Sequence, residues 1–318
     1  MRTVNLEQVR KYMAAPAESL HIKPASEYLS KVLDRIDGTN DDVSGDRMPW
    51  QKSWNILRLR ASELSIWTGF NGHYKSMLLN FIMLDVMQFR RVLIISPEMQ
   101  PEETLYRMCL QAAGNNNPPA PFVRQFTRWT DGRFWIYEQA DSIKVDVIKA
   151  VIRYAAIELE INHIVIDSLM MCGTDGNDSH ASQTQEKVFV RDLVSLAKDH
   201  NIHIHLVAHA RKSQARDESK APGKQDVLGS GHITNLAHNV FSVWWNVPRH
   251  EKLEGDLSDV DRKKFEQKPE ILLTCCKQRN GWWKGKLCLW LNDGLQFLES
   301  QGERGPRHEY KSNIDGTA

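Results

Sequence analysis

The chain has 318 residues, and its 41 lysines and arginines are matched by 40 aspartates and glutamates, which leaves a net charge of +1. This balance argues neither for nor against a polyanionic partner, so any contact with nucleic acid has to come from a local basic patch. The five cysteines form no C-x-x-C pair, and no apolar stretch approaches the roughly 18 residues of a membrane span. These features exclude a disulfide framework and a membrane span, and they predict a cytoplasmic protein without zinc.

The N-terminal part of the chain is predicted to be a short helical arm. Residues 4–14 and 25–36 place apolar side chains at helical spacing. A polar run rich in glycine, aspartate and asparagine, residues 37–46, separates them from the rest of the chain. We therefore expect an arm over residues 1–49 that is distinct from the main domain.

From Trp50 onward, short β-branched apolar runs alternate with helical stretches, which is typical of βαβ units. This rhythm predicts an α/β domain over residues 50–299, with a mainly parallel central sheet flanked by helices. The polar tail, residues 300–318, is predicted to be disordered. The predicted strands are LSIWTG, RVLIIS, RFWIYE, HIVID, IHIHLVAHA and 239–246, the predicted helices are 75–89, 101–113, 143–158, 185–199 and 232–238, and a charged insert (249–268) precedes two antiparallel edge strands.

A glycine-containing turn links the strand LSIWTG to the helix that starts at Lys75. The segment fits the phosphate-loop pattern G-x-x-x-x-G-K-[ST], except that Tyr74 stands where the pattern has glycine. Because such a turn presents backbone N–H groups to phosphates, Lys75 is expected to bind the β- and γ-phosphates and Ser76 to bind Mg²⁺. A side chain at position 74 costs on the order of 1–3 kcal/mol if the loop needs an unusual dihedral there. The alternative is an ordinary Asn/Gly turn. The predicted nucleotide-binding residues are Gly69, Phe70, Asn71, Gly72, His73, Tyr74, Lys75 and Ser76.

Two other apolar strands each end in a carboxylate that is expected at the same edge of the sheet. HIVIDSL ends in Asp167, which is predicted to hold Mg²⁺, with capping of the next element as the alternative. RVLIISPEM ends in Glu98, which is predicted to polarise the water that attacks the γ-phosphate. The alternative for Glu98 is a solvated acid at the start of helix 101–113.

The strand IHIHLVAHA points His203, His205 and His209 to one face. His209, at the strand end, is predicted to sense the γ-phosphate, and simple packing is the alternative. The basic loop after this strand predicts a contact with nucleic acid, the alternative being a solvated charged loop. Its basic residues are Arg211, Lys212, Arg216, Lys220 and Lys224.

The segment CKQRNG places Lys277 and Arg279 two positions apart, and hence on one face of a strand, at the start of a predicted tight Asn-Gly turn. A basic pair in this position can reach a neighbouring subunit's nucleotide and supply charge to phosphoryl transfer. The alternative is an edge-strand cationic pair that discourages aggregation.

Six segments, taken in chain order, together resemble one family. They are ELSIWTGFNGHYKS, LIISPEM, HIVIDSL, HLVAHARK, DVLGSGHITNLAHNVFSVWWN and KQRNG, and they span about residues 50–298. They are similar to the RecA-fold helicase domain of the DnaB-type replicative helicases, the phage primase-helicases and the mitochondrial helicase Twinkle. The resemblance implies a RecA-like P-loop ATPase and helicase domain that follows the helical arm.

The resemblance also implies an assembly, a substrate and residue roles. It implies a homohexamer that binds ATP and Mg²⁺ between subunits, holds single-stranded DNA in a central channel and translocates 5′ to 3′ to unwind duplex DNA during replication. An arm helix would dock on the adjacent subunit. The implied roles are nucleotide binding for Lys75 and Ser76, catalytic base for Glu98, Mg²⁺ binding for Asp167, phosphate sensing for His209, action in trans for Lys277 and Arg279, and DNA-phosphate binding for loop 211–231, in which Gly229, Ser230 and Gly231 offer backbone donors.

The sequence departs from the family pattern in two ways. Tyr74 puts the ATPase rate in question; Tyr74→Gly is expected to keep or raise turnover, and a loss would give the tyrosine a positive role. No primase or zinc module precedes Trp50, so we expect a separate primase and a DNA polymerase as partners, and an origin in a phage or other mobile element. Two alternatives stay open: a RecA- or KaiC-like DNA-binding ATPase without helicase activity, and a weakly hydrolysing nucleotide-binding ring module.

Overall fold

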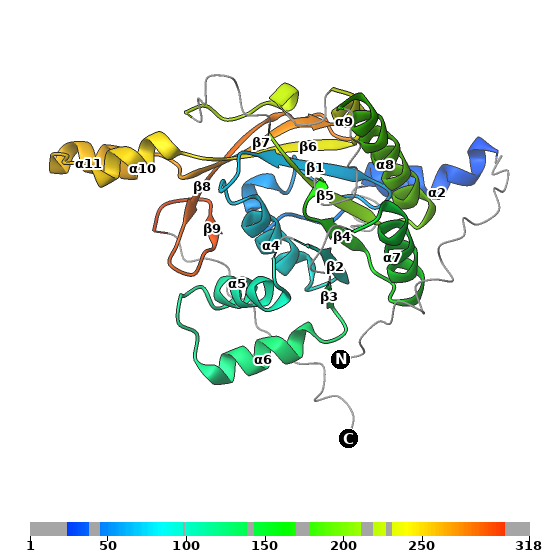
Figure 1. The fold of residues 1–318 in the computed structure, drawn as a ribbon, viewed down its shortest axis with the longest axis horizontal. Coiled ribbons are helices and arrows are strands. Elements are labelled where there is room, and N and C mark those ends of the chain that lie inside the picture. Colours follow the sequence, from blue (N-terminus) through cyan, green and yellow to red (C-terminus); the bar gives the residue numbers. More distant parts are fainter. Residues whose placement is uncertain are drawn as a thin grey trace.

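The structure, a computed structural model, describes residues 24–37, 45–97, 99–138, 143–169, 179–210, 219–226 and 231–302. Within these residues the chain forms a nine-stranded sheet in the order β3-β2-β4-β5-β1-β6-β7-β8-β9 (Figure 1). The strands from β3 to β6 in this order run parallel, and β7, β8 and β9 are antiparallel. The predicted α/β class with a mainly parallel sheet is therefore confirmed.

The strand bounds follow the predicted apolar runs closely. The segment predicted as the last edge strand is divided into β8 and β9, and β7 lies inside the sheet between β6 and β8 rather than at its edge. The strands are β1 (Leu64–Gly69), β2 (Val92–Ile95), β3 (Phe134–Tyr137), β4 (His163–Ile166), β5 (His203–His209), β6 (Asn239–Trp245), β7 (Ile271–Gln278), β8 (Gly285–Leu291) and β9 (Phe297–Leu298).

The described residues contain three α-helices that the sequence pattern did not predict, namely α6, α10 and α11. α6 begins directly after Pro119, and its apolar side chains Phe122, Phe126 and Trp129 recur at helical spacing and pack against the core. The charged insert folds as two helices, α10 and α11. The helical elements are η1 (Ala25–Tyr28), α2 (Leu29–Asp37), η2 (Gln51–Ser53), α4 (Lys75–Val86), α5 (Pro101–Ala113), α6 (Ala120–Thr130), α7 (Val145–Glu158), α8 (Ser179–Asp199), η4 (Lys224–Asp226), α9 (Gly231–Leu236), α10 (Val247–Glu254) and α11 (Asp259–Glu266). None of the described helices is long and apolar enough to cross a membrane.

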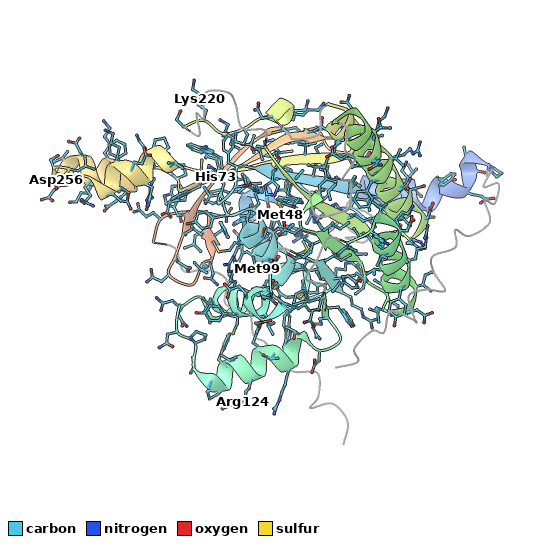
Figure 2. All side chains as sticks on the ribbon, in the orientation of Figure 1. Met48, His73, Met99, Arg124, Lys220 and Asp256 are labelled. Carbon is cyan, nitrogen blue, oxygen red and sulfur yellow. The ribbon has the colours of Figure 1, made fainter. Side chains whose placement is uncertain are left out.

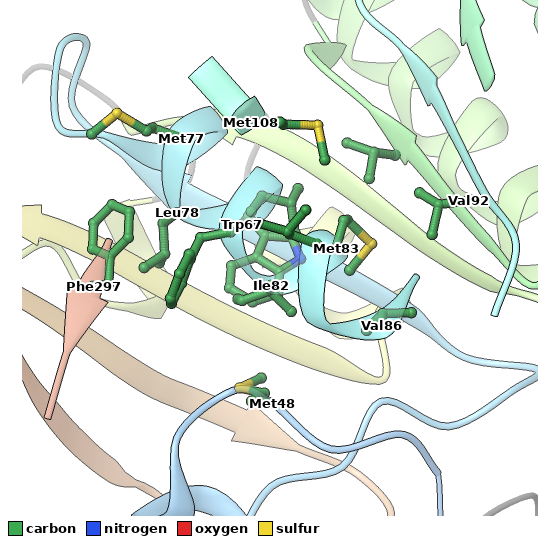
Figure 3. Close-up of a cluster of buried hydrophobic side chains, with 14 of the residues drawn as sticks. Met48, Trp67, Met77, Leu78, Ile82, Met83, Val86, Val92, Met108 and Phe297 are labelled. Carbon is green, nitrogen blue, oxygen red and sulfur yellow. The ribbon is translucent and has the colours of Figure 1, made fainter. Parts of the chain in front are cut away.

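Strand alternation distributes the core over both faces of the sheet. In β1, Ile66 packs with α7, α8 and α9, whereas the next residue, Trp67, packs on the opposite face with α4, α5 and α6. α4 is buried on nearly all sides, and Leu78 and Ile82 lie against Trp67 in Figure 3. A helix that is apolar all round belongs in the interior. This burial fixes the start of α4, and hence the turn that precedes it, against the end of β1.

The helix predicted over residues 25–36 is present as η1 and α2, whereas the helix predicted over residues 4–14 lies outside the described residues. In Figure 1, α2 projects from the body, and its apolar side chains are exposed, by 61% for Leu29 and 74% for Ile36. Met48 and Trp50, in contrast, are buried against the sheet. The helical arm therefore carries an apolar face that the rest of the described subunit leaves uncovered.

Three histidines from β4 and β5 stack inside the sheet, with ring centroids 4.3 Å apart for His203 and His205 and 5.3 Å apart for His163 and His205. His163 and His205 share a 3.0 Å hydrogen bond. His163 also contacts the carboxylate of Asp46 at 2.9 Å. Two of the three histidines predicted on one face of β5 are therefore structural, and His209 stands apart from them at the strand end.

Stability is expected to fall as the pH drops below about 6.5, the ordinary histidine value. Burial lowers the pKa of His203 and His205 well below that value, and burial together with the charge of Arg279 lowers the pKa of His238 to about 4. The folded protein therefore keeps these side chains neutral while the unfolded chain binds protons. The contribution of each such histidine to the free energy of unfolding is fully present above the pKa that it has in the unfolded chain. Below that pKa the contribution decreases by roughly 1.4 kcal/mol per pH unit.

The measurement is urea denaturation at pH 7.5, 6.5 and 5.5. With three buried histidines, the free energy of unfolding should decrease by up to about 4 kcal/mol per pH unit toward the acid end. The variant His205→Asn should show a slope smaller by about one third. A free energy of unfolding that is constant between pH 7.5 and 5.5 would contradict neutral burial of these residues.

Candidate nucleotide-binding site

A cavity of about 690 Å³ opens at the edge of the sheet where the parallel strands end, which we call the carboxyl edge. Gly69, the last residue of β1, is paired with His209, the last residue of β5, so the ends of these two strands lie side by side. Ligands of open α/β sheets bind at such carboxyl edges. The cavity is lined by Asn71, Gly72, His73, Tyr74, Lys75, Ser76, Met77, Met99, Arg107, Asp167, His209 and Leu295.

The loop between β1 and α4 has the backbone that the phosphate-loop pattern requires. A Cβ at Gly69 would collide with the carbonyl oxygen of Val243, so only glycine fits there. Gly72 has φ 78°. Tyr74 has φ 61° and ψ 18°, which is the left-handed region, even though it carries a side chain. The loop therefore does need the unusual dihedral at position 74, and Gly72 supplies a second left-handed position.

Lys75 begins α4 and is only 6% exposed. Its Nζ lies inside the curve of the loop and donates a 2.8 Å hydrogen bond to the carbonyl oxygen of Phe70. The next residue, Ser76, also lines the cavity. A helix N-terminus with a buried ammonium group above it favours bound anions. The local chemistry therefore suits phosphate groups.

Asp167 follows β4 and is 7% exposed, and its backbone N–H donates to the carbonyl oxygen of Ile95 at 2.9 Å. The peptide bond between Asp167 and Ser168 is cis. Asp167 and Ser76 line the same cavity and also an adjoining recess with Asn80, Ser96 and Thr104. A hydroxyl and a carboxylate that line one space form a donor set that suits a hydrated Mg²⁺ ion. The predicted magnesium pair is thus brought together.

His209 lines the cavity, as the prediction required, whereas His203 and His205 lie in the core. Glu98 lies outside the described residues, although Ser96 and Met99, on either side of it, line the cavity and its recess. The role of Glu98 therefore stays a prediction.

Lys277 and Arg279 are not near this cavity. β7 is antiparallel to β6, and Gln278 pairs with Asn239, the first residue of β6. The pair therefore lies at the edge where the parallel strands begin, which we call the amino edge. The six residues of β1 separate the two edges by about 20 Å. Neither residue can act on its own subunit's cavity.

At the amino edge both cations contact the C-terminal carbonyl groups of α9. Nζ of Lys277 donates to the carbonyl oxygens of Thr234, Asn235 and Ala237 at 2.9, 3.0 and 2.6 Å. Arg279 donates to Asn235 at 2.8 Å. Cations at a helix C-terminus are stabilising. Burial, followed by the charges of Arg279 and Lys224, lowers the pKa of Lys277 to about 8.

The tight Asn-Gly turn predicted after Arg279 is wrong, because six residues, 279–284, connect β7 to β8. Asn280 is exposed, but its side-chain amide donates to the buried carboxylate of Glu63 at 2.7 Å. The second oxygen of Glu63 accepts a 2.8 Å hydrogen bond from Asn239. β7 lies between β6 and β8 in the sheet, but its pairing with β8 ends at Cys275, so the edge-strand alternative for the cationic pair stays open.

Only part of the predicted DNA loop is described, namely Lys220, Lys224 and Gly231. Lys220 is exposed. Lys224 donates to the side chain of Asn235 at 3.3 Å, and Gly231 begins α9. Arg211, Lys212, Arg216, Gly229 and Ser230 lie outside the described residues. The end of this loop is therefore connected through α9 to Lys277 and Arg279.

Four lining residues have no counterpart among the predicted site residues: Met77, Met99, Arg107 and Leu295. Arg107 brings a second cation to the cavity, and its Nε donates to Glu103 at 2.7 Å on the same helix. The i,i+4 spacing of Arg107 and Glu103 can be read from the sequence. That spacing does not predict, however, that this side of α5 faces the phosphate loop. Leu295 comes from the β8–β9 connection, far along the chain.

The fold and the cavity together define a P-loop protein with a RecA-like arrangement of strands. A family model described as an AAA domain matches residues 34–215, more than half of the chain, and the chain belongs to this family. No curated protein matches the chain.

Two solved structures show the same fold. A DnaB-like replicative helicase, described with its interactions with primase, has a TM-score of 0.68 at 15% identity, over 87% of this chain and 67% of that chain. A second structure, which is described as an ATPase domain, has a TM-score of 0.70 at 16% identity, over 87% of this chain and 99% of that domain. The chain thus has the RecA-like fold of replicative-helicase ATPase domains.

Proposed function

We propose that this protein is an ATP-driven, ring-forming DNA helicase that moves along single-stranded DNA and unwinds duplex DNA during replication. The observation that carries the proposal is the separation of two parts of one catalytic centre. The phosphate-binding cavity lies at the carboxyl edge, and the cationic pair of Lys277 and Arg279 lies at the amino edge. A head-to-tail contact between subunits would join the two parts.

Nucleotide binding would use the residues gathered at the carboxyl edge. Lys75 and Arg107 bring positive charge to the phosphates, and the N-terminus of α4 adds backbone donors. Ser76 and Asp167 would hold Mg²⁺, which neutralises charge on the β- and γ-phosphates when bound. His209 would detect the γ-phosphate, and Glu98 would orient the attacking water.

Head-to-tail contacts close into rings or run on as open filaments. In a closed ring, each cavity would receive Arg279 from the next subunit, which supports hydrolysis only at assembled interfaces. The exposed apolar face of α2 supports the same assembly, because an uncovered row of large apolar side chains on a projecting helix favours docking on another copy. We expect six subunits, in line with the family resemblance.

Single-stranded DNA would be held by loop 211–231, with Lys220 and Lys224 among its contacts and Gly231 supplying a backbone donor. α9 follows this loop directly, and its C-terminal carbonyl groups contact Lys277 and Arg279. A shift of the loop during the ATP cycle would therefore be passed to the residues that face the neighbouring nucleotide. We also propose that translocation runs 5′ to 3′ and that a separate primase and a polymerase are partners. The proposal further includes a cytoplasmic location and an origin in a phage or other mobile element.

The test is strand displacement on forked DNA with ATP and Mg²⁺, together with DNA-stimulated phosphate release. We expect ATP-dependent unwinding of a substrate with a 5′ single-stranded tail and none with a non-hydrolysable analogue. DNA-dependent hydrolysis without strand displacement would favour a RecA- or KaiC-like ATPase. Nucleotide-dependent rings without phosphate release, unchanged in Glu98→Gln, would favour a non-catalytic ring module.

A further inference from the structure

Two neighbouring residues of the phosphate loop contact one tryptophan, Trp245, at the end of β6. The Tyr74 ring meets the Trp245 ring edge-to-face, with centroids 5.7 Å apart and planes at 88°. The His73 ring meets it in the same manner at 6.2 Å. In addition, the backbone N–H of Trp245 donates to Nδ1 of His73 at 3.2 Å. The loop is therefore attached to the end of β6 by two ring contacts and one hydrogen bond.

The Trp245 ring is also in contact with the first turn of the α10–α11 insert, because its centroid lies 4.8 Å from that of His250. The insert joins β6 to β7 and projects far from the sheet at the carboxyl edge (Figure 1). In Figure 2, His73 lies on the side of the body from which the insert extends, and Asp256 marks its far end. Trp245 thus stands between the phosphate loop and the base of the insert.

Arg249, which is 8% exposed, makes hydrogen bonds at the base of the insert. Its guanidinium donates to the carbonyl oxygens of Phe265 and Glu266 at 3.1 and 3.3 Å and to the carboxylate of Glu270 at 3.0 Å. Charge-assisted hydrogen bonds of a buried arginine are among the stronger ones. Arg249 thus connects α10 to the end of α11 and to the start of β7. Because Trp245 packs on α10, these bonds also define the position of Trp245.

Tyr74 adopts a left-handed backbone that glycine adopts without strain. A tyrosine in this position therefore needs a compensating contact, and the Trp245 ring is the contact it makes. We propose that Trp245 is a positioning residue of the nucleotide site, which holds the phosphate loop in its binding shape through the Tyr74 ring. This inference rests on the proposed ATPase function. It gives Tyr74 the positive role that the loop pattern alone did not predict.

The test is a double-mutant cycle on Trp245→Ala in two backgrounds, the natural chain and Tyr74→Gly. An edge-to-face pair changes an equilibrium constant by roughly two- to tenfold, so Trp245→Ala should raise the Kd for a non-hydrolysable ATP analogue by about that factor in the natural chain. In Tyr74→Gly, Trp245→Ala should leave the Kd nearly unchanged. Tyr74→Phe, which keeps the ring, should retain the natural Kd.

Steady-state kinetics and a matched control complete the test. KM for ATP should rise in Trp245→Ala, while kcat changes less, because the tryptophan shapes the loop and does not touch the reacting phosphate. Phe122→Ala, which removes one ring of the stacked Phe122–Phe126 pair on α6, should leave the Kd unchanged. Equal effects of Trp245→Ala in both backgrounds would overturn the proposal, as would no effect at all. Retention of analogue binding by Lys75→Ala would instead overturn the nucleotide site itself.

Discussion

Replacing Lys75 with alanine is expected to abolish nucleotide binding and ATP hydrolysis. Lys75 is a buried cation whose Nζ lies within the curve of the phosphate loop, 2.8 Å from the carbonyl oxygen of Phe70. Removing a preorganised charge that stabilises a transferring phosphate costs at least about a hundredfold in rate. Because the same charge also attracts the bound nucleotide, we expect the affinity to fall with it.

The measurement is phosphate release with and without single-stranded DNA, together with binding of a fluorescent ATP analogue. Lys263→Ala removes an exposed cation from α11 and is the matched control, with no expected change in either quantity. Melting curves would show that the Lys75→Ala chain is folded. Normal turnover in folded Lys75→Ala would mean that the loop is an ordinary turn before a helix.

The second large effect is expected from Arg279→Ala in the assembled protein. An arginine supplied to the neighbouring subunit's phosphate is worth about 10³ to 10⁵ in turnover, so hydrolysis should fall by that order. Nucleotide binding by the variant's own cavity should stay intact, because Arg279 lies at the opposite edge of the sheet. A loss of turnover without a loss of affinity would separate this role from that of Lys75.

Mixing two inactive variants tests the action in trans directly. An interface between an Arg279→Ala subunit, whose cavity is intact, and a Lys75→Ala subunit, whose arginine is intact, contains all parts of the centre. The mixture should therefore regain hydrolysis. A mixture of Lys75→Ala with Asp167→Asn, both altered in the same cavity, should stay inactive. Mixed rings without recovered activity would show that Arg279 does not act across the interface.

Much of the fold could be predicted because its signals are local. Apolar runs such as HIVID identify buried strands, and a strand that turns directly into a helix at Lys75 identifies the phosphate loop. The same reasoning placed Asp167 and His209 at strand ends, where the cavity is found. Parallel strands bring their carboxyl ends to one edge whatever their order in the sheet. The position of these residues could therefore be predicted without knowing the strand order.

Other features depend on contacts between distant segments and could not be predicted. The sequence points His203, His205 and His209 to one face of β5, yet the first two stack in the core, and only the strand end reaches the cavity. The conformation after Arg279 follows from the buried carboxylate of Glu63, which lies more than two hundred residues earlier in the chain and binds Asn280.

By itself the sequence determined the alternation of strands and helices, the place of the phosphate loop and the identity of its lysine, serine and nearby aspartate. These follow from hydrophobic period and from the short-range geometry of strand ends and helix starts. The tertiary structure alone decided that Lys277 and Arg279 lie at the edge opposite the cavity and that Tyr74 packs on Trp245. Those relations depend on the antiparallel pairing of β7 with β6 and on the parallel pairing of β6 with β1, which places Trp245 beside the loop, and no local pattern encodes either.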